Sequence, residues 1–440
     1  MQHNKDYFPL KILAKNVSRP FNFNKHSEVI FVNTGDVLEG KFLHNNISSN
    51  KNLPGQAKKA IQKNDILLTE IRPANKRYAF VDSAKNNYVV STKFMVIVAN
   101  EIVDSKYLYI VITSKNVLGD FQSIAETRSG TFPQITFDAI AHYEIYVPSK
   151  SNQLKIVSII EAISKKIDLL KETNQTLEAI AQAIFKSWFV NFDPVHAKQQ
   201  GIECAGIDKA TADLFPNSFV ESELGLIPKG WEVKAIGECL QVVDFVANGS
   251  FAALKENVTL FREPNYALYV RTTDYNSNFN GDFRFVDERA YRFLSKSFLV
   301  GDETIISNVG DVGTVFRAPK WLGYLMTLGS NAVALKNKEM PTYVYYFFKS
   351  NKGQHLIQSI ITGSAQLKFN KTSLRSKSIL IPSKSTLDCF ENITSAITEK
   401  MDTNQNGIKL LQNIRDTLLP RLISGKLDLS NIEEELEGVA

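Results

Sequence analysis

The sequence contains few of the residues from which metal sites and disulfide frameworks are built. Its 440 residues include three cysteines and six histidines, and none of these forms a CxxC, HExxH or HxE…CxxC pattern. Isolated cysteines are typical of free thiols in a reducing compartment. We therefore expect a cytoplasmic protein with no structural or catalytic metal.

Long apolar runs and catalytic motifs are also missing. No stretch approaches the ~18 apolar residues of a membrane-spanning helix, and the start MQHNKDYFPLK has no apolar signal region. There is no Walker A loop, no GxGxxG opening a helix and no (N/D/S)PP(Y/F) motif for presenting a flipped adenine. The sequence thus predicts no membrane contact, no catalytic residues and no cofactor on this chain.

What the sequence does contain is a long internal repeat. YEIYVPSKS (143–151) returns as KSILIPSKS (377–385), which places Pro148 and Pro382 234 residues apart. NDILLTEIR (64–72) corresponds to GDETIISNV (301–309), and VNTGD (32–36) corresponds to VRTTD (270–274). The offset drifts by only a few residues, as insertions in surface loops allow. The pattern predicts a tandem duplication of one unit.

The net charge of +5 is unevenly distributed. Residues 1–150 carry 19 Lys and Arg against 13 Asp and Glu, a net +6, and residues 225–385 carry 20 against 13, a net +7. The segments after each copy are acidic, with −3 over 151–224 and −5 over 386–440. One basic copy alone would most simply have a solvated surface, but recurrence in both copies favours a polyanionic partner.

A heptad pattern follows each copy. From Ile156 to Trp188, in alternating steps of four and three, nine of ten positions are apolar and only Asn174 is polar. The same phase, shifted by 234 residues, contains Asn404. Seams of this length predict two long helices of about 33 residues each.

The two asparagines set the expected register. When the helices run antiparallel with partner numbers that sum to 578, Asn174 faces Asn404. A parallel pair would place each amide against an apolar residue, and an unsatisfied amide costs ~1–3 kcal/mol. We therefore predict an intramolecular antiparallel coiled coil whose register is fixed by Asn174 and Asn404. Two unlike basic domains related by its pseudo-twofold axis predict a split DNA target with different halves.

Three segments make the sequence resemble a known family. FKSWFVNFDPVHAK (185–198), LIPKGWEV (226–233) and RDTLLPRLISGKLDL (415–429) are similar to conserved segments of the specificity subunits of type I restriction–modification systems. The resemblance covers the full chain, although the first copy starts at YFPLKIL without the PKGW lead-in of the second. It implies a subunit that recognises a bipartite DNA site and has no catalytic activity.

The resemblance also implies the partners and the fold. The partners are double-stranded DNA, two modification subunits that methylate adenine with S-adenosylmethionine, and restriction subunits that translocate and cut DNA. The fold class is α+β: two tandem mixed α/β target-recognition domains, each followed by a long helix, with the helices paired as the coiled coil. The expected divisions are a first domain at 1–151, a helix at 152–192, a linker at 193–225, a second domain at 226–385, a helix at 386–425 and a tail at 426–440.

Two other functions stay open on the sequence. A fused restriction and methylation enzyme of related type would need catalytic motifs that this length lacks. A coiled-coil scaffold without a DNA role would leave the two basic domains unexplained.

Two segments of the first domain are candidates for DNA contact. Reading bases requires hydrogen-bonding side chains, and phosphate contacts require cations or backbone N–H groups. EIRPANKRYAF (70–80) is rich in cations, and ETRSGTFPQ (126–134) is a glycine-containing loop with several donors. The structural alternatives are a charged hairpin tip and a turn that leads into the last strand. The residues expected to contact DNA are Arg72, Lys76, Arg77, Tyr78, Lys93, Arg128, Ser129, Thr131 and Gln134.

The second domain differs at the corresponding places. SNVGDVG (307–313) replaces the basic tip with Gly and Asn, and TGSAQLK (362–368) corresponds to the glycine-containing loop. NTGD and RTTD form a third pair, for which a capping or bracing role is favoured because Asp36 and Asp274 would repel phosphate. The residues expected to contact DNA are Arg271, Thr272, Asn308, Thr362, Ser364, Gln366 and Lys368.

An aromatic group lies at the end of the first long helix. Trp188, Phe189 and Phe192 are predicted to form a docking face for the modification subunits. Packing of the same rings in a core is the equally weighted alternative.

Overall fold

The computed structural model describes residues 6–83, 85–128, 130–364 and 366–427. The chain forms two compact units, one of Met1–Asp168 with Leu410–Ala440 and one of Leu169–Lys409. Two long helices, α5 (Lys150–Phe185) and α15 (Lys384–Leu422), cross this division, so each unit contains part of both. The globular part of the first unit, β1 to β12 (Tyr7–Tyr146), is called the first head, and that of the second unit, β15 to β24 (Glu232–Ile381), the second head.

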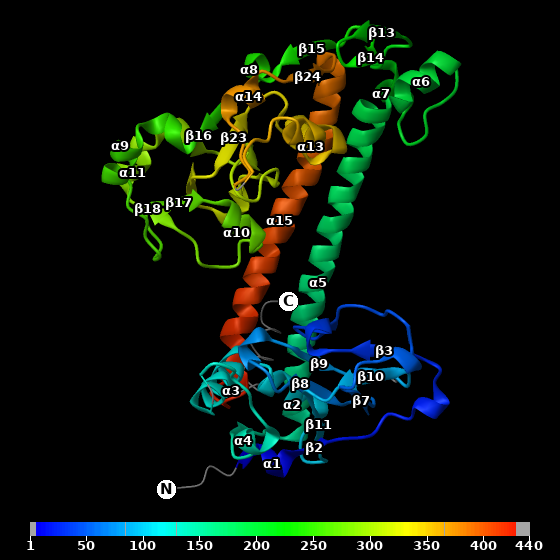
Figure 1. Ribbon diagram of the computed structural model, residues 1–440, viewed down its shortest axis with the longest axis vertical. Coiled ribbons are helices and arrows are strands. Elements are labelled where there is room, and N and C mark those ends of the chain that lie inside the picture. The colour runs from blue at the N-terminus through cyan, green and yellow to red at the C-terminus, as the bar shows by residue number, and fades with distance from the viewer. Residues whose placement is uncertain (1–5, 84, 129, 365, 428–440) are drawn as a thin grey trace, which may run out of the picture. The chain divides into compact units, whose positions relative to one another are not determined.

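The first head is built on two four-stranded sheets (Figure 1). The order in one is β2 (Ala14–Val17), β11 (Phe94–Ala99), β8 (Ile66–Thr69), β9 (Tyr78–Phe80); in the other it is β6 (Ser48–Ser49), β3 (Glu28–Val32), β10 (Tyr88–Ser91), β7 (Ala57–Ala60). Only β3 and β10 run parallel among these pairs of described strands. Further pairs are β1 (Tyr7–Pro9) with β12 (Glu144–Tyr146) and β4 (Val37–Leu38) with β5 (Lys41–Phe42). The helices are α1 (Leu10–Leu13), α2 (Ser105–Ile112), α3 (Lys115–Arg128) and α4 (Phe137–Ile140), with short turns η1 (Phe23–Lys25), η2 (Thr34–Asp36), η3 (Asn50–Asn52) and η4 (Pro73–Asn75).

The second head repeats this strand order. One sheet is β16 (Gln241–Asp244), β23 (Ala332–Lys336), β20 (Thr304–Ser307), β21 (Val315–Arg317); the other is β18 (Phe285–Val286), β17 (Ala267–Val270), β22 (Leu325–Leu328), β19 (Phe298–Leu299), with β17 and β22 parallel. β15 (Glu232–Ala235) pairs with β24 (Ser378–Ile381). The helices are α8 (Ile236–Cys239), α9 (Phe251–Asn257), α10 (Thr272–Asn276), α11 (Glu288–Phe293), α12 (Pro341–Lys349), α13 (Asn351–Gln358) and α14 (Lys371–Arg375), with short turns η6 (Phe245–Asn248), η7 (Ser295–Ser297) and η8 (Lys320–Leu322). The shared topology confirms the predicted duplication.

The central strands β8 and β20 are buried along their whole length because both of their faces are covered. In β8, Ile66 and Leu68 pack with residues of α2 and α3, while Leu67 packs with residues of the other sheet. In β20, Ile306 packs with residues of the helices α12 and α13, and Ile305 packs with residues of the other sheet. A strand enclosed on two sides needs a continuous apolar run rather than an alternating one.

The long helices pair antiparallel within each unit. In the second unit, Asn404 Nδ2 donates to Asn174 Oδ1 at 2.8 Å, and the rings of Trp188 and Phe390 lie 6.0 Å apart. In the first unit, Ile156 and Leu422 belong to one buried cluster. All three pairs follow the predicted register, in which partner numbers sum to 578. The expected coiled coil and its asparagine pair are therefore present.

The segment expected to be a linker has its own structure. α5 continues as a π-helical turn (Lys186–Asn191, η5) and ends at Phe192, whose φ is 58°. The described chain then forms α6 (Asp193–Gln200), α7 (Lys209–Asp213) and a hairpin of β13 (Phe219–Ser222) with β14 (Gly225–Pro228). Val195 and Phe215 from this segment are buried in the same core as the second head. The predicted C-terminal tail falls largely outside the described residues, beyond 427.

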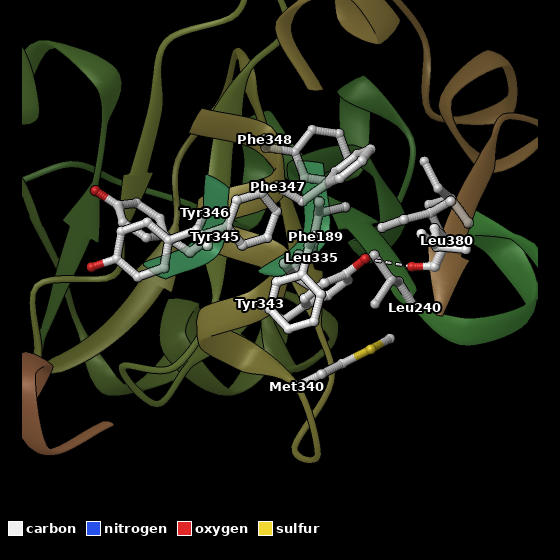
Figure 2. Close-up of a cluster of buried hydrophobic side chains, with 14 of the residues drawn as sticks. Phe189, Leu240, Leu335, Met340, Tyr343, Tyr345, Tyr346, Phe347, Phe348 and Leu380 are labelled. Atoms are coloured by element: carbon white, nitrogen blue, oxygen red, sulfur yellow. Dashed lines mark hydrogen bonds between the residues drawn. The ribbon is translucent and has the colours of Figure 1, made fainter. Parts of the chain in front are cut away.

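The aromatic rings at the end of the first helix are part of the core. Trp188, Phe189 and Phe192 are only 2%, 3% and 9% exposed, and they pack with Phe390 and Trp231. Figure 2 shows Phe189 inside this cluster beside residues of α12. Rings with at most 9% of their surface exposed offer little area for docking, so the prediction for these three residues is corrected to core packing.

The described residues form neither a metal-binding cluster nor a membrane-spanning helix. Among the described residues, no group of three or more His, Cys, Asp or Glu side chains is arranged to hold a metal ion. In the same part of the chain, no helix combines the length and apolar character needed to cross a membrane.

Candidate nucleic-acid interface

The hairpin between β8 and β9 presents the predicted basic tip of the first head. Arg72 and Lys76 are exposed and flank the turn η4, with φ of 42° and 56°. Left-handed backbone is costly for residues other than glycine and persists only where neighbouring contacts fix it. The tip is therefore held in a defined shape that points two cations at solvent.

The second predicted segment lies directly beside this tip. Gln134 forms a β-bridge with Ile71, and Arg72 N donates to Pro133 O at 3.1 Å. Thr131 is exposed on the same loop, and Arg128 is exposed at the end of α3, where its Nη1 donates to Thr136 Oγ1 at 3.3 Å. Ser129 lies outside the described residues. Two segments that are far apart in sequence thus form one continuous surface.

Arg77 is bonded to the backbone of the head, whereas Lys76 and Arg72 are directed towards solvent. Arg77 Nη1 donates to the carbonyl oxygens of Gly35 and Val37 at 2.9 and 3.0 Å, which ties the tip to the turn η2. Arg77 is therefore a brace, and its predicted contact with DNA is corrected accordingly. Lys76 pairs with Glu39 at 2.7 Å in an exposed ion pair, whereas Arg72 has no ion-pair partner among the described residues.

Tyr78 and Lys93 are half-buried at the base of the hairpin. The Tyr78 ring packs against Tyr109 with centroids 6.0 Å apart. Burial raises the pKa of Tyr78 to about 12, and the nearby carboxylate of Glu39 adds to the shift while Arg415 opposes it. The phenol is neutral at physiological pH and belongs mainly to the head's interior. The backbone oxygen of Lys93 accepts from Glu70 N at 2.9 Å.

The second head brings its two predicted segments together in the same way. Val309 forms a β-bridge with Lys368, and Gly310 N donates to Leu367 O at 3.3 Å. The loop closes between Thr362 and Lys368, whose backbones exchange hydrogen bonds of 2.8 and 3.0 Å. Gly363 has a φ of 96°, and a Cβ there would lie 2.4 Å from Gln366 O, so the loop requires glycine.

The exposed side chains of the second interface differ in charge from those of the first. Ser364, Gln366 and Lys368 are exposed on the closed loop, as is Thr362. The tip itself carries Asp311, whose carboxylate accepts from Thr314 Oγ1 at 2.8 Å and from Asn276 Nδ2 at 3.2 Å. The first tip thus presents cations, and the second presents a carboxylate flanked by amides and hydroxyls.

Three residues predicted to contact DNA in the second head have internal roles instead. Arg271 forms an ion pair with the buried Asp274 at 2.6 Å and donates to Asp282 O at 2.7 Å. The hydroxyl of Thr272 and the amide oxygen of Asn308 are buried without a hydrogen-bond partner in the described structure, and Asn308 Nδ2 faces Phe369 O at 3.4 Å. These three predictions are corrected because the polar atoms point into the head.

The NTGD and RTTD pair has the capping role that the sequence favours. Asp36 and Asp274 each accept from the backbone N–H three residues earlier, at Asn33 and Arg271, with both distances 2.9 Å.

What the sequence did not reveal is the pairing of the tip with the glycine-containing loop. The only available signal is that the separation of the two segments is similar in both copies.

The fold and these surfaces define a class of protein: a duplicated nucleic-acid-binding protein whose two heads share one topology and differ in the side chains that face outward. The comparisons agree with this class. A family model described as "Type I restriction modification DNA specificity domain" matches residues 5–179 and 228–419.

Individual relatives of the chain are also specificity subunits of type I restriction enzymes. The chain is 36% identical over 467 aligned residues to the type I restriction enzyme HindI specificity subunit of Haemophilus influenzae, covering 96% of this chain and 99% of that protein. It is 26% identical to the MjaIX specificity subunit of Methanocaldococcus jannaschii, covering 84% and 79%. Among solved structures, it resembles the S subunit of a type I restriction–modification system from M. genitalium with a TM-score of 0.55 and 15% identity, covering 96% and 98%, which supports the fold.

The chain belongs to the type I restriction–modification DNA specificity family. Its role is the recognition of DNA sequence rather than catalysis, and it associates with DNA and with other subunits of a restriction–modification complex. Neither of the alternatives, a fused enzyme or a scaffold without a DNA role, receives support.

Proposed function

We propose that this specificity subunit reads a split double-stranded DNA target, with one half-site for each head. The observation that carries the proposal is the paired arrangement of tip and glycine-containing loop, which recurs in both heads with different exposed side chains. A repeated frame with unlike contact groups fits two half-sites of unlike sequence.

The exposed groups have distinct recognition chemistry. In the first head, the exposed Arg72 and the half-buried Gln134 are of the two kinds that form bidentate hydrogen bonds, the first with guanine and the second with adenine. Lys76, Arg128 and Thr131 are placed beside them for phosphate contact. In the second head, Gln366 and Ser364 offer base contacts, and Lys368 and Thr362 offer phosphate contacts.

The proposal includes the identity of the partners. Two modification subunits, which carry S-adenosylmethionine and methylate adenine, and the restriction subunits complete the assembly, and this chain holds no cofactor itself. The working compartment is the cytoplasm, in keeping with three cysteines that are all free thiols.

Methylation mapping tests the split target directly. The chain is co-expressed with a compatible modification subunit, and methylated adenines are located across the host genome. We expect one motif with two different halves separated by a fixed gap. An uninterrupted motif, or methylation without a motif, would contradict two independent half-sites.

A charge variant tests the first interface. Arg72→Ala in the assembled complex is expected to lower affinity for the cognate duplex roughly tenfold, on the scale of one bidentate base contact. Lys165→Ala, which removes an 80% exposed cation from α5 outside the head, is the matched control and should change little. Equal effects of the two variants in a fluorescence anisotropy titration at fixed salt would remove Arg72 from the interface.

A further inference from the structure

Helix α12 of the second head has no N-terminal cap of its own. Met340 precedes it and Pro341 begins it, and no side chain from this stretch caps its first turn. A carboxylate from the long helix α15 takes that place. Glu391 accepts from Tyr343 N at 2.8 Å, Thr342 Oγ1 at 2.8 Å and Thr342 N at 3.2 Å. A negative charge at a helix N-terminus is favourable, and three donors fix its direction.

The other long helix holds the same short helix further along. Glu178 of α5 accepts from the hydroxyl of Tyr346 at 3.1 Å and from that of Tyr345 at 3.5 Å. Figure 2 shows these two hydroxyls pointing to the same side, away from the hydroxyl of Tyr343, which donates to Leu380 O. Burial raises the pKa of both Tyr345 and Tyr346, and Glu178 adds to the shift, so both phenols remain donors.

The sheet of the second head contributes a third polar contact. Arg317 at the end of β21 lies 3.6 Å from the carboxylate of Asp402 on α15, and its guanidinium is 5.6 Å from the centre of the Tyr345 ring. Burial raises the pKa of Asp402, while Arg317 opposes the shift. Around these contacts, the Phe185 and Phe390 rings of the two long helices pack on Tyr346. The second head is thus connected to both helices by directional bonds within an apolar contact.

The first head is attached by a different set of groups. In the first head, α2 corresponds to α12. Gln153 of α5 contacts its start, where Gln153 Oε1 accepts from the N–H of the N-cap residue Asp104 at 2.6 Å. Lys106 of α2 also pairs with Glu161 of α5. Both contacts come from α5, whereas α12 of the second head is held by one carboxylate from each long helix.

We propose that Glu178 and Glu391 are positioning residues that set the gap between the two half-sites by fixing the angle of the second head on the paired helices. Apolar burial resists separation of two surfaces but is not directional, so it permits small rotations. Hydrogen bonds weaken steeply as their angle changes. Two carboxylates on different helices that bind one short helix therefore prevent it from pivoting. This inference rests on the proposed split target.

The test compares gap preference in matched variants of the assembled complex with its modification subunits. Glu391→Gln and Glu178→Gln keep the side-chain shape but remove the negative charge that strengthens these hydrogen bonds. Glu391→Gln in addition turns an NH₂ group towards a backbone N–H donor of Thr342 or Tyr343. Glu399→Gln and Glu172→Gln change exposed glutamates on the same two helices and serve as controls. Each complex is assayed on duplexes that carry both half-sites with the gap shortened or lengthened by one or two base pairs.

We expect the wild type and both controls to prefer one gap. The two positioning variants should lose roughly tenfold of that preference, the scale of one hydrogen bond to a charged group, while a mismatch in either half-site still reduces binding. A lower melting temperature with an unchanged gap profile would show a purely structural role and overturn the inference. If the wild type itself accepts all gaps equally, the split-target proposal fails instead.

Discussion

Replacement of the buried asparagine pair by leucine is the sharpest test of how the long helices recognise each other. Asn404 is 4% exposed, and its Nδ2 donates to Asn174 Oδ1 at 2.8 Å. Asn174 Nδ2 in turn donates to Met401 O at 3.1 Å. In Asn174→Leu, the amide of Asn404 loses its acceptor in a place that water reaches poorly. We expect this variant to lose ~1–3 kcal/mol of stability.

The reverse single variant should be milder. In Asn404→Leu, Asn174 keeps its bond to the Met401 carbonyl and is only half-buried, so water can satisfy its free oxygen. A loss of about 1 kcal/mol is expected. The double variant leaves neither of these two amides in the seam and buries two more leucines. It should be at least as stable as either single variant, because an apolar pair that replaces both partners costs little.

The measurement is a double-mutant cycle by urea denaturation of the full chain, followed by circular dichroism. Both asparagines belong to the unit Leu169–Lys409, so the transition of that unit should move while the other stays in place. An unchanged m-value would show that stability, and not the extent of unfolding, has changed. If Asn174→Leu is as stable as the wild type, or if the two single effects simply add, the pair has no energetic role in register.

Three further outcomes are expected. Trp188→Ala should cost about 3–5 kcal/mol in the same denaturation assay because the ring is 2% exposed in a packed core; a variant of normal stability that fails only in complex assembly would restore the docking interpretation. Gly363→Ala should weaken DNA binding through the second head, since its Cβ would meet Gln366 O at 2.4 Å, and a crystal structure of the variant with an unmoved loop would argue against this. Burial raises the pKa of Glu391 in the folded state above its ordinary value of 4.5. Proton binding to Glu391 therefore stabilises the folded state fully below pH 4.5, and this stabilisation is lost as the pH rises through the pKa of the folded state. Between pH 4 and 7, the urea midpoint of Glu391→Gln should fall less than that of the wild type, because glutamine does not titrate.

The parts of the molecule that follow from local repetition were predictable. A heptad pattern is a feature of successive residues, and the single asparagine in each seam was enough to place Asn174 opposite Asn404. The duplication was equally readable, because matching strands such as β8 and β20 keep their apolar runs and their spacing. The register of the helices and the duplication both depend on residues that are near one another in sequence, so both could be predicted from the sequence.

The parts that depend on long-range partners were not predictable. Arg72 and Arg77 are both cations in one short segment, yet only the folded hairpin shows that Arg77 turns back onto Gly35 and Val37. Arg271 is likewise occupied by a buried aspartate and a distant carbonyl. Trp188 was ambiguous for the same reason, since an aromatic residue suits a docking face and a core equally well until its surroundings are known.

The left-handed residues at the tip of the first head have a consequence for binding kinetics. Arg72 and Lys76 in the tip have positive φ without being glycine, as does Glu39 in the turn between β4 and β5, which pairs with Lys76. Each such conformation costs on the order of 1–3 kcal/mol that surrounding bonds must outweigh. A loop shaped before any encounter loses little entropy on association, and it adapts poorly to a duplex that differs by one base pair. Discrimination by this tip should therefore appear as rapid dissociation from near-cognate duplexes more than as unusually slow release of the correct one.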